Sequence, residues 1–166
     1  LAATDQNTAI AIAAIANDTD PDLSDRLQVV AIDGASLTTA TPVTLASGAR
    51  VSLAADGRLN YDTNGAFAYL AEGQTGSDRF DYRLSDGHGG FADASVTVTI
   101  TGRNDAPIAV LDARDMSEDG TSSVDIAGLL ANDRDPDPGD AIRLTAVSDQ
   151  GALVNARIEG VAVILD

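Results

Sequence analysis

The chain has 166 residues and a formal net charge of −16, because 26 acidic side chains face ten arginines and no lysine. A chain of this length forms one domain or two small ones, and its 44% of apolar residues suffices for a core. The acidic balance argues against nucleic acid and anionic membranes as partners, and the absence of cysteine excludes disulfides and thiolate metal sites.

Short strands are predicted along most of the chain, because apolar and β-branched residues alternate between turn signals. Residues 10–16 alone could pass as a short helix. Asp56-Gly57 and Asn64-Gly65 suit hairpin turns, and the SDGHGG sequence at 85–90 is a glycine-rich turn. The predicted strands are residues 27–32, 50–54, 58–62, 65–70, 80–84, 94–100, 108–111, 142–147, 153–158 and 161–165. This spacing predicts an all-β, antiparallel β-sandwich.

A ten-residue motif occurs twice. ANDTDPDLSD at 16–25 and ANDRDPDPGD at 131–140 share seven identical positions at an offset of 115, and an apolar run follows each copy. Further along, GARVSLAADG at 48–57 pairs with GALVNARIEG at 151–160 at an offset of 103. The repeat is therefore structural as well as compositional, and neither copy is whole.

Three motifs in order resemble the cadherin-like tandem repeats of large bacterial surface proteins, the group that includes VCBS-type and RTX-adhesin repeats. They are LLANDRDPDPGDAIRL at 129–144 with its degenerate twin at 14–29, FDYRLSDGHGGFADASVTVTI at 80–100, and NDAP at 104–107 followed by SEDG at 117–120. The resemblance implies a Greek-key cadherin/immunoglobulin-like β-sandwich of about a hundred residues per unit. It also implies that the units are joined in tandem on a secreted protein, with one or two calcium ions stiffening each joint. We expect one repeat at 1–103, without its first strand, and the N-terminal part of a second at 104–166.

The acidic loops of the two copies are the candidate metal sites. Calcium takes six to eight oxygen ligands, and carboxylates at alternate positions of a tight loop can turn toward one centre. Aspartate, which supplies 23 of the 26 acidic residues, suits such loops. The candidates are Asn17, Asp18, Asp20 and Asp22 in the first copy, and Asn132, Asp133, Asp135, Asp137 and Asp140 in the second. A solvated acidic turn is the alternative.

A further candidate set would meet only at a folded joint between two units, because its members come from separate segments. They are Asp86 from the glycine-rich turn, Asn104 and Asp105 from the linker, and Glu118 and Asp119 from the second unit, together with the second acidic loop. The alternative is that NDAP is merely a turn and that Glu118 and Asp119 form an exposed pair.

Catalysis has little support. His88 is the only histidine, it is flanked by glycines, and it lies too close in sequence to Ser85 and Asp86 to argue for a preorganised triad. We therefore do not expect an enzyme.

Carbohydrate binding is the rival function, because calcium can bridge sugar hydroxyls. A lectin site usually also needs an exposed aromatic platform. Phe80 and Tyr82 share a strand face that favours the core, whereas Tyr61, Tyr69 and Phe91 are undetermined. Two exposed tyrosines beside an acidic loop would favour a lectin.

These patterns together predict a calcium-binding repeat module of a secreted, cell-surface bacterial adhesin or of a matrix protein such as that of a biofilm, acting in adhesion or as a spacer. Its expected partners are neighbouring repeats of the same chain and, for the lectin alternative, a cell-surface or matrix polysaccharide. Membrane insertion is not expected, because the longest low-charge stretch, at 8–16, is too short. A chain that starts at Leu1 looks like a piece of something longer.

Overall fold

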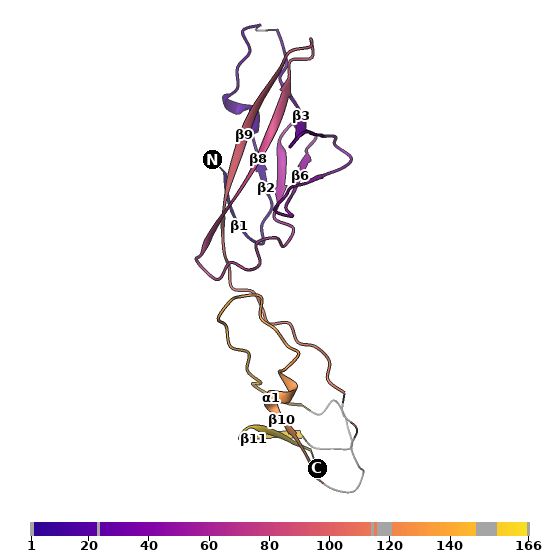
Figure 1. Ribbon diagram of the computed structural model, residues 1–166, viewed down its shortest axis with the longest axis vertical. Coiled ribbons are helices and arrows are strands. Elements are labelled where there is room, and N and C mark those ends of the chain that lie inside the picture. The colour runs from indigo at the N-terminus through magenta and orange to yellow at the C-terminus, as the bar shows by residue number, and fades with distance from the viewer. Residues whose placement is uncertain (1, 23, 114, 116–120, 149–155, 166) are drawn as a thin grey trace. The chain divides into compact units, whose positions relative to one another are not determined.

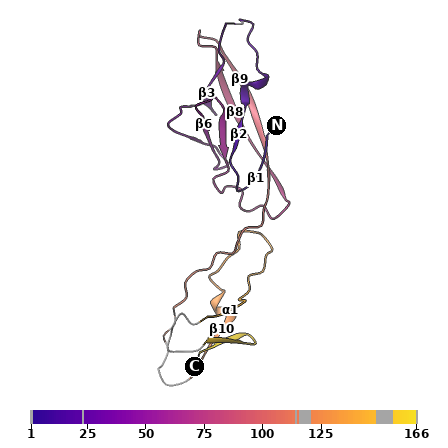
Figure 2. The same ribbon diagram turned by 180° about the vertical axis from the view of Figure 1, so that it is seen from behind.

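The computed structural model describes residues 2–22, 24–113, 115, 121–148 and 156–165. The chain divides into two compact units, Leu1–Asn104 and Asp105–Asp166, and each is described by itself. Most of the regular secondary structure in both units is strand, and the second unit also contains long loops (Figures 1 and 2), so the prediction of an all-β fold is confirmed.

The first unit consists of two sheets. Its strands are β1 (Ala2–Asp5), β2 (Ile10–Ile12), β3 (Gln28–Ile32), β4 (Ala35–Ser36), β5 (Val43–Thr44), β6 (Arg50–Leu53), β7 (Leu59–Asp62), β8 (Thr75–Ser85) and β9 (Phe91–Thr101). One sheet has the order β1-β9-β8-β3-β4 and the other the order β2-β7-β6-β5. Neighbouring strands are antiparallel except for β1, which runs parallel to β9.

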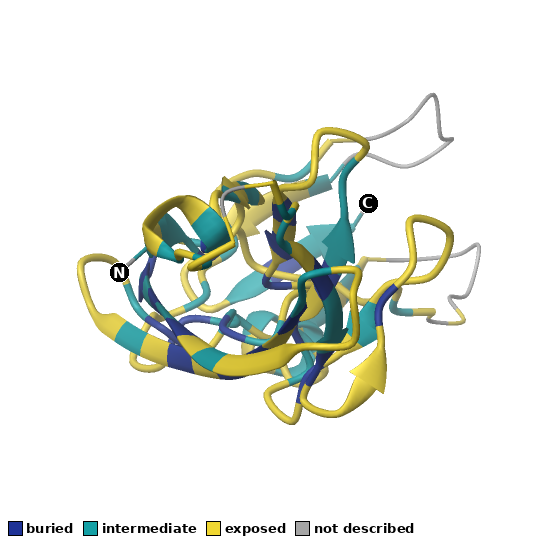
Figure 3. Ribbon diagram, turned by 90° about the horizontal axis from the view of Figure 1, so that it is seen from above, coloured by how far each residue is buried: buried dark blue, intermediate teal, exposed yellow. Residues whose placement is uncertain are grey.

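The hairpin of β8 and β9 is the longest element and follows directly from the sequence pattern. Phe80, Tyr82 and Leu84 alternate with exposed residues and point into the core. On the outer face the Arg83 guanidinium lies 2.7 Å from the Asp93 carboxylate, and this pair lowers the pKa of Asp93. Buried residues lie along the strands, whereas the connecting loops are mostly exposed (Figure 3).

The core lies between the two sheets. The rings of Tyr61 on β7 and Phe80 on β8 stack with centroids 6.3 Å apart and an interplanar angle of 9°. The Tyr61 hydroxyl donates to the buried carboxylate of Asp78 at 2.8 Å, and Ser47 Oγ donates to the same oxygen at 2.7 Å. Burial, together with the bond to Asp78, raises the pKa of Tyr61. One polar network therefore ties β7 to β8 through the core.

The second unit repeats part of the first. Its elements are β10 (Ser122–Asp125), a short helix α1 (Ile126–Leu129), β11 (Ala156–Glu159) and β12 (Ala162–Leu165). The sheet order β10-β12-β11 matches β2-β7-β6, and β12 falls on β7 at the repeat offset of 103. Val163 is the one buried apolar residue that the structure describes in this unit.

Some predicted elements differ. Residues 65–70 form successive turns and not a strand, because Asn64 (φ 50°) and Gly65 (φ 74°) are left-handed and the backbone then closes turns that bury Phe67 and Leu70. Residues 142–147 form no strand, and residues 108–111 form only a bridge from Ile108 to Arg134. Residues 10–16 are divided between β2 and the 3-10 helix η1 (Ala14–Asn17).

Candidate metal centre

The first acidic loop is shaped by three short-range hydrogen bonds. The Asp18 N–H donates to Ile15 O at 3.2 Å and thus closes η1. The Asp22 N–H then donates to Asp20 Oδ1 at 2.8 Å, and the Asp25 N–H donates to Asp22 O at 2.9 Å. An aspartate that accepts from the backbone two residues on forms an Asx turn, which this residue type favours.

The second acidic loop has the same three bonds at the repeat offset of 115. The Asp133 N–H donates to Leu130 O at 3.3 Å, the Asp137 N–H to Asp135 Oδ1 at 3.0 Å, and the Asp140 N–H to Asp137 O at 3.3 Å. The sequence repeat is therefore also a repeat of backbone geometry.

Each loop gathers three carboxylates. Asp20, Asp22 and Asp25 form one group and Asp135, Asp137 and Asp140 the other, and within each group the possible ligand atoms lie within 4.8 Å of one another. Two oxygens that each lie about 2.4 Å from one calcium ion are at most about 4.8 Å apart. Both groups therefore have the spacing that a hard cation requires.

The two loops differ in how far their carboxylates are shielded from solvent. Asp137 is only 3% exposed, whereas its counterpart Asp22 is exposed. Asp137 Oδ2 accepts the backbone N–H of Asp105 at 2.6 Å, and Asp137 Oδ1 is buried without a hydrogen-bond partner. A buried carboxylate oxygen of this kind is costly unless it is paired or coordinates a cation.

Residues 105–112 provide the cover over the second loop. The backbones of Ile108 and Arg134 exchange two hydrogen bonds, at 2.7 and 3.1 Å. The Val110 N–H donates to Asp133 Oδ1 at 2.8 Å, and Asn132 Nδ2 donates to Asp112 Oδ1 at 3.2 Å. Asp133 and Asn132 thus hold this covering segment and are not part of the carboxylate group.

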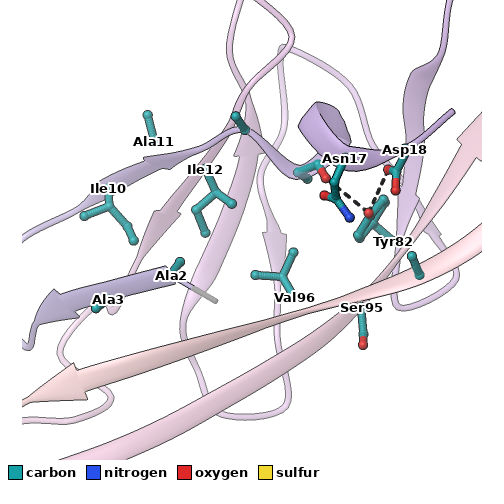
Figure 4. Close-up of a pocket in the computed structure, with 13 residues that line it drawn as sticks. Ala2, Ala3, Ile10, Ala11, Ile12, Asn17, Asp18, Tyr82, Ser95 and Val96 are labelled. Carbon is teal, nitrogen blue, oxygen red and sulfur yellow. Dashed lines mark hydrogen bonds between the residues drawn. The ribbon is translucent and has the colours of Figure 1, made fainter.

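Asp18, the counterpart of Asp133, also lies outside its carboxylate group. Its Oδ2 accepts the Tyr82 hydroxyl at 2.8 Å, and the same hydroxyl lies 3.2 Å from Ala14 O (Figure 4). Burial, together with the bond to Asp18, raises the pKa of Tyr82 to about 12. Asn17 is exposed beside it.

Asp86 closes its own turn. Its carboxylate accepts the backbone N–H groups of His88, at 2.7 Å, and Gly90, at 3.0 Å, and these bonds lower the pKa of Asp86. Glu118 and Asp119 lie outside the described residues. Asp86 lies at the end of the hairpin where Ser85 pairs with Phe91, whereas Asn104 follows the other end, where Thr101 pairs with Thr75. The length of an 11-residue strand separates the two ends, so the prediction that Asp86 and Asn104 share an ion is wrong. The sharing of an ion by Asn104, Asp105 and the second loop stays a prediction.

Asp25 is the residue of the first group that the motif reading omitted. Its carboxylate is nearly buried, and its Oδ2 lies 3.1 Å from Nδ1 of the exposed His88. The sequence repeat could have identified Asp25, because it aligns Asp25 with the candidate ligand Asp140.

The aromatic residues do not form the pair that a lectin site was expected to show. Tyr61 and Tyr82 are buried, so Tyr69, at 57% exposure, is the one exposed tyrosine. Phe91 is 65% exposed and lines a groove of about 250 Å³ together with Asp20 and Asp86.

Comparison with protein families places these features in a known group. Residues 1–102 match the model of the bacterial cadherin-like domain. The chain belongs to this family. Residues 103–163 of the cadherin-like chain match a second model, described as cadherin-like domain, so the expected resemblance is confirmed. A search of curated proteins found no match.

The family is relevant to the two acidic loops. Cadherin-like domains are adhesion and structural modules that generally bind calcium, and the bacterial ones occur in surface and extracellular proteins. No helix of this cadherin-like chain, within the residues described, has the length and apolar character needed to cross a membrane.

Proposed function

We propose that the chain is a calcium-binding repeat module of a secreted bacterial adhesin or matrix protein, in which it acts in cell adhesion or as a calcium-stiffened spacer. The observation that carries this proposal is the buried Asp137 Oδ1, which lacks a hydrogen-bond partner in a loop where two further carboxylates lie within 4.8 Å. Three like charges at this spacing repel one another until a cation neutralises them.

The donor set fits a hard cation. Asp135, Asp137 and Asp140 offer only oxygen, and backbone carbonyls and water can complete the six to eight ligands that calcium takes. Calcium would supply the positive charge that lets these carboxylates stay close together. The first loop has the same carboxylates without the cover, so we expect it to bind calcium more weakly.

Calcium-linked stability of the full chain tests the proposal. An ion that binds only the folded state adds about 2.7 kcal/mol at a hundred times its Kd. Millimolar calcium should therefore raise the melting temperature and EDTA should lower it. Magnesium should do less, because it demands octahedral geometry. Identical melting curves in calcium and in EDTA would contradict the proposal.

Three matched variants assign the binding to the loops. Asp137→Asn and Asp22→Asn change equivalent residues, and Asp56→Asn removes the same charge from an Asx turn outside both groups. In calorimetric titration, Asp137→Asn should abolish the tighter calcium site, Asp22→Asn the weaker one, and Asp56→Asn neither. In EDTA, Asp137→Asn should melt no lower than the wild type, because it relieves repulsion. Unchanged titrations for both loop variants would assign calcium elsewhere.

A calcium-dependent lectin is the second candidate, and the exposed Phe91 beside Asp20 and Asp86 favours it. An exposed ring next to a bound cation could stack on a sugar while the ion bridges hydroxyls. Binding to a bacterial polysaccharide array that needs calcium and is lost in Phe91→Ala would support this function. Binding that is absent, or that is unchanged in this variant, would leave adhesion or spacing by repeats.

A further inference from the structure

The two copies of the repeat differ by one insertion. Residues 16–25 match the second copy at an offset of 115, and residues 48–57 match it at an offset of 103. Between these two matches the first copy therefore holds twelve residues that the second copy lacks. Both copies form sheets of the same order, β2-β7-β6 and β10-β12-β11, so the insertion is not needed for these sheets.

The insertion differs in composition from the rest of the chain. Residues 34–55 contain no aspartate or glutamate, whereas the whole chain has 26 acidic residues in 166. Within this window the sequence TTATP at 38–42 combines three threonines with an alanine and a proline. Segments rich in serine and threonine that also contain proline are typical of O-glycosylated stalks, in which the attached sugar is bulky and solubilising.

The structure places residues 38–42 at the surface and anchors them at both ends. Leu37 and Leu45 are buried, at 7% and 5% exposure. The Leu37 N–H donates to Val30 O at 2.8 Å, and the Leu45 N–H donates to Ala49 O at 2.8 Å. Between these anchors every residue from 38 to 42 is exposed. The three threonine side chains of the loop therefore lie in water and not in the core.

The backbone of this loop is also accessible to an enzyme. Residues 37–42 lie between β4 and β5 and belong to no strand or helix. Pro42 disfavours helical backbone at Thr41 and favours an extended one. The three threonines at 97–101 differ, because they belong to β9, are half-buried and pair with β8. A transferase can close around an acceptor hydroxyl on the loop, whereas it would have to unpair the strand to do so on β9.

We propose that Thr38, Thr39 and Thr41 are acceptors for O-linked sugar. In the transfer, the threonine Oγ forms a bond to the anomeric carbon of a sugar that is activated as a glycosyl diphosphate. The bond from that carbon to the diphosphate breaks, the diphosphate leaves with the electron pair, and the hydroxyl proton passes to a base of the transferase. The attached sugar solvates a window without carboxylates and shields an exposed loop of the kind that proteases cut. This modification goes beyond the proposed calcium-dependent function and is independent of it.

Peptide mass spectrometry of the full chain, purified from the bacterium that produces it, tests the proposal. Trypsin cuts after Arg26 and Arg50, so one peptide, residues 27–50, carries the whole loop. We expect this peptide to be heavier than its sequence by one or more hexose or N-acetylhexosamine residues, and base-catalysed β-elimination should remove the added mass. Electron-transfer fragmentation should locate the sugar on residues 38–41. The tryptic peptide of residues 84–103, which carries the β9 threonines, is the internal control and should have the mass of its sequence.

Two matched variants separate the hydroxyl groups from the loop that carries them. Thr38→Val, Thr39→Val and Thr41→Val together remove the three hydroxyls, and serine at the same three positions keeps them. Because residues 38–42 are exposed, both variants should melt like the unmodified wild type. The serine variant should keep the added mass, and the valine variant should lose it.

Four results would overturn the proposal. They are a peptide 27–50 from the producing bacterium with the mass of its sequence, a phosphate on this peptide in place of sugar, sugar on the peptide 84–103 alone, and a valine variant that keeps the full added mass. None of them depends on calcium, so the proposed calcium-dependent function is tested separately.

Discussion

Asp22 and Asp137 occupy the same position in two copies of one loop, and their surroundings differ. Asp137 is buried because the Asp105 N–H and residues 105–112 cover it, whereas Asp22 is exposed to water. Water around Asp22 screens its repulsion from Asp20 and Asp25, so the first loop has less to gain from a cation. The two loops share one motif, so the difference in calcium affinity that we expect between them comes from the covering segment.

The Tyr82 hydroxyl gives a pH-dependent test at the same scale. Its bonds to Asp18 and Ala14 contribute about 1 kcal/mol to stability. Because folding raises the pKa of Tyr82 from 10.0 to about 12, this contribution is complete below pH 10 and is lost as the pH rises through 12. Urea unfolding should therefore show Tyr82→Phe less stable than the wild type at pH 8, with the two proteins converging between pH 10 and 12.

The exposed Tyr69 supplies the control for this experiment. Tyr69→Phe removes a hydroxyl from a ring that is not part of the core, so it should unfold like the wild type at pH 8. The free energies of unfolding of the wild type and Tyr82→Phe could instead differ by a constant amount up to pH 12. That result would show that the Tyr82 hydroxyl does not stabilise the fold through the protonated form.

Residue-level prediction from the sequence worked where a motif implies local geometry. The alternating aspartates predict the Asx turns, because each carboxylate accepts from a backbone group two residues away. The motif could not show that Asp18 turns toward Tyr82, 64 residues further along the chain. It also could not show that Asp133 accepts from Val110, because such partners are set by tertiary packing.

At the scale of elements, strands with clear alternation were predicted well and short edge strands were not. β8 and β9 bury every second residue over much of their length, which the sequence displays directly. β1, β4 and β5 are too short or too small in side-chain volume to show a period. Residues 65–70 looked like a strand because Phe67 and Leu70 are apolar, but turns bury these two residues instead.

The two units should differ in local stability. All buried apolar side chains of the described residues belong to the core of the first unit except Val163. Local opening costs least where few apolar contacts are buried. Hydrogen exchange followed by mass spectrometry should therefore show fast exchange in peptides covering residues 121–148 and slow exchange in those covering β8 and β9. Equally slow exchange up to Val163 would contradict this expectation.

At the scale of the whole molecule, the duplicated motif was the most informative part of the sequence. It predicted two copies of one unit, and the structure shows the same sheet order in β2-β7-β6 and β10-β12-β11. The groove of about 620 Å³ between β2 and β9 was not predictable in this way, because it depends on how the two sheets pack.

The parallel pairing of β1 with β9 determines how the first unit responds to tension. A pull along the chain enters before Ala2 and leaves after Thr101, at opposite ends of the paired stretch from Ala2–Val98 to Asp5–Thr101. The hydrogen bonds between the two strands are then loaded together, in shear, and cannot open one at a time. The first unit should therefore resist stretching more strongly than its melting temperature suggests.

Single-molecule force spectroscopy can compare β1 residues whose N–H groups bond to β9 with β1 residues whose N–H groups point away from it. The Gln6 N–H donates to Thr101 O at 3.0 Å, so strand alternation directs the Thr4 N–H toward β9 and the Ala3 N–H away from it. Thr4→Pro should lower the unfolding force markedly and Ala3→Pro only slightly, and equal forces would show that β1 does not carry the load. In the proposed adhesion role, this geometry would help the chain hold a cell in flowing liquid, because the pull loads the β1–β9 hydrogen bonds together.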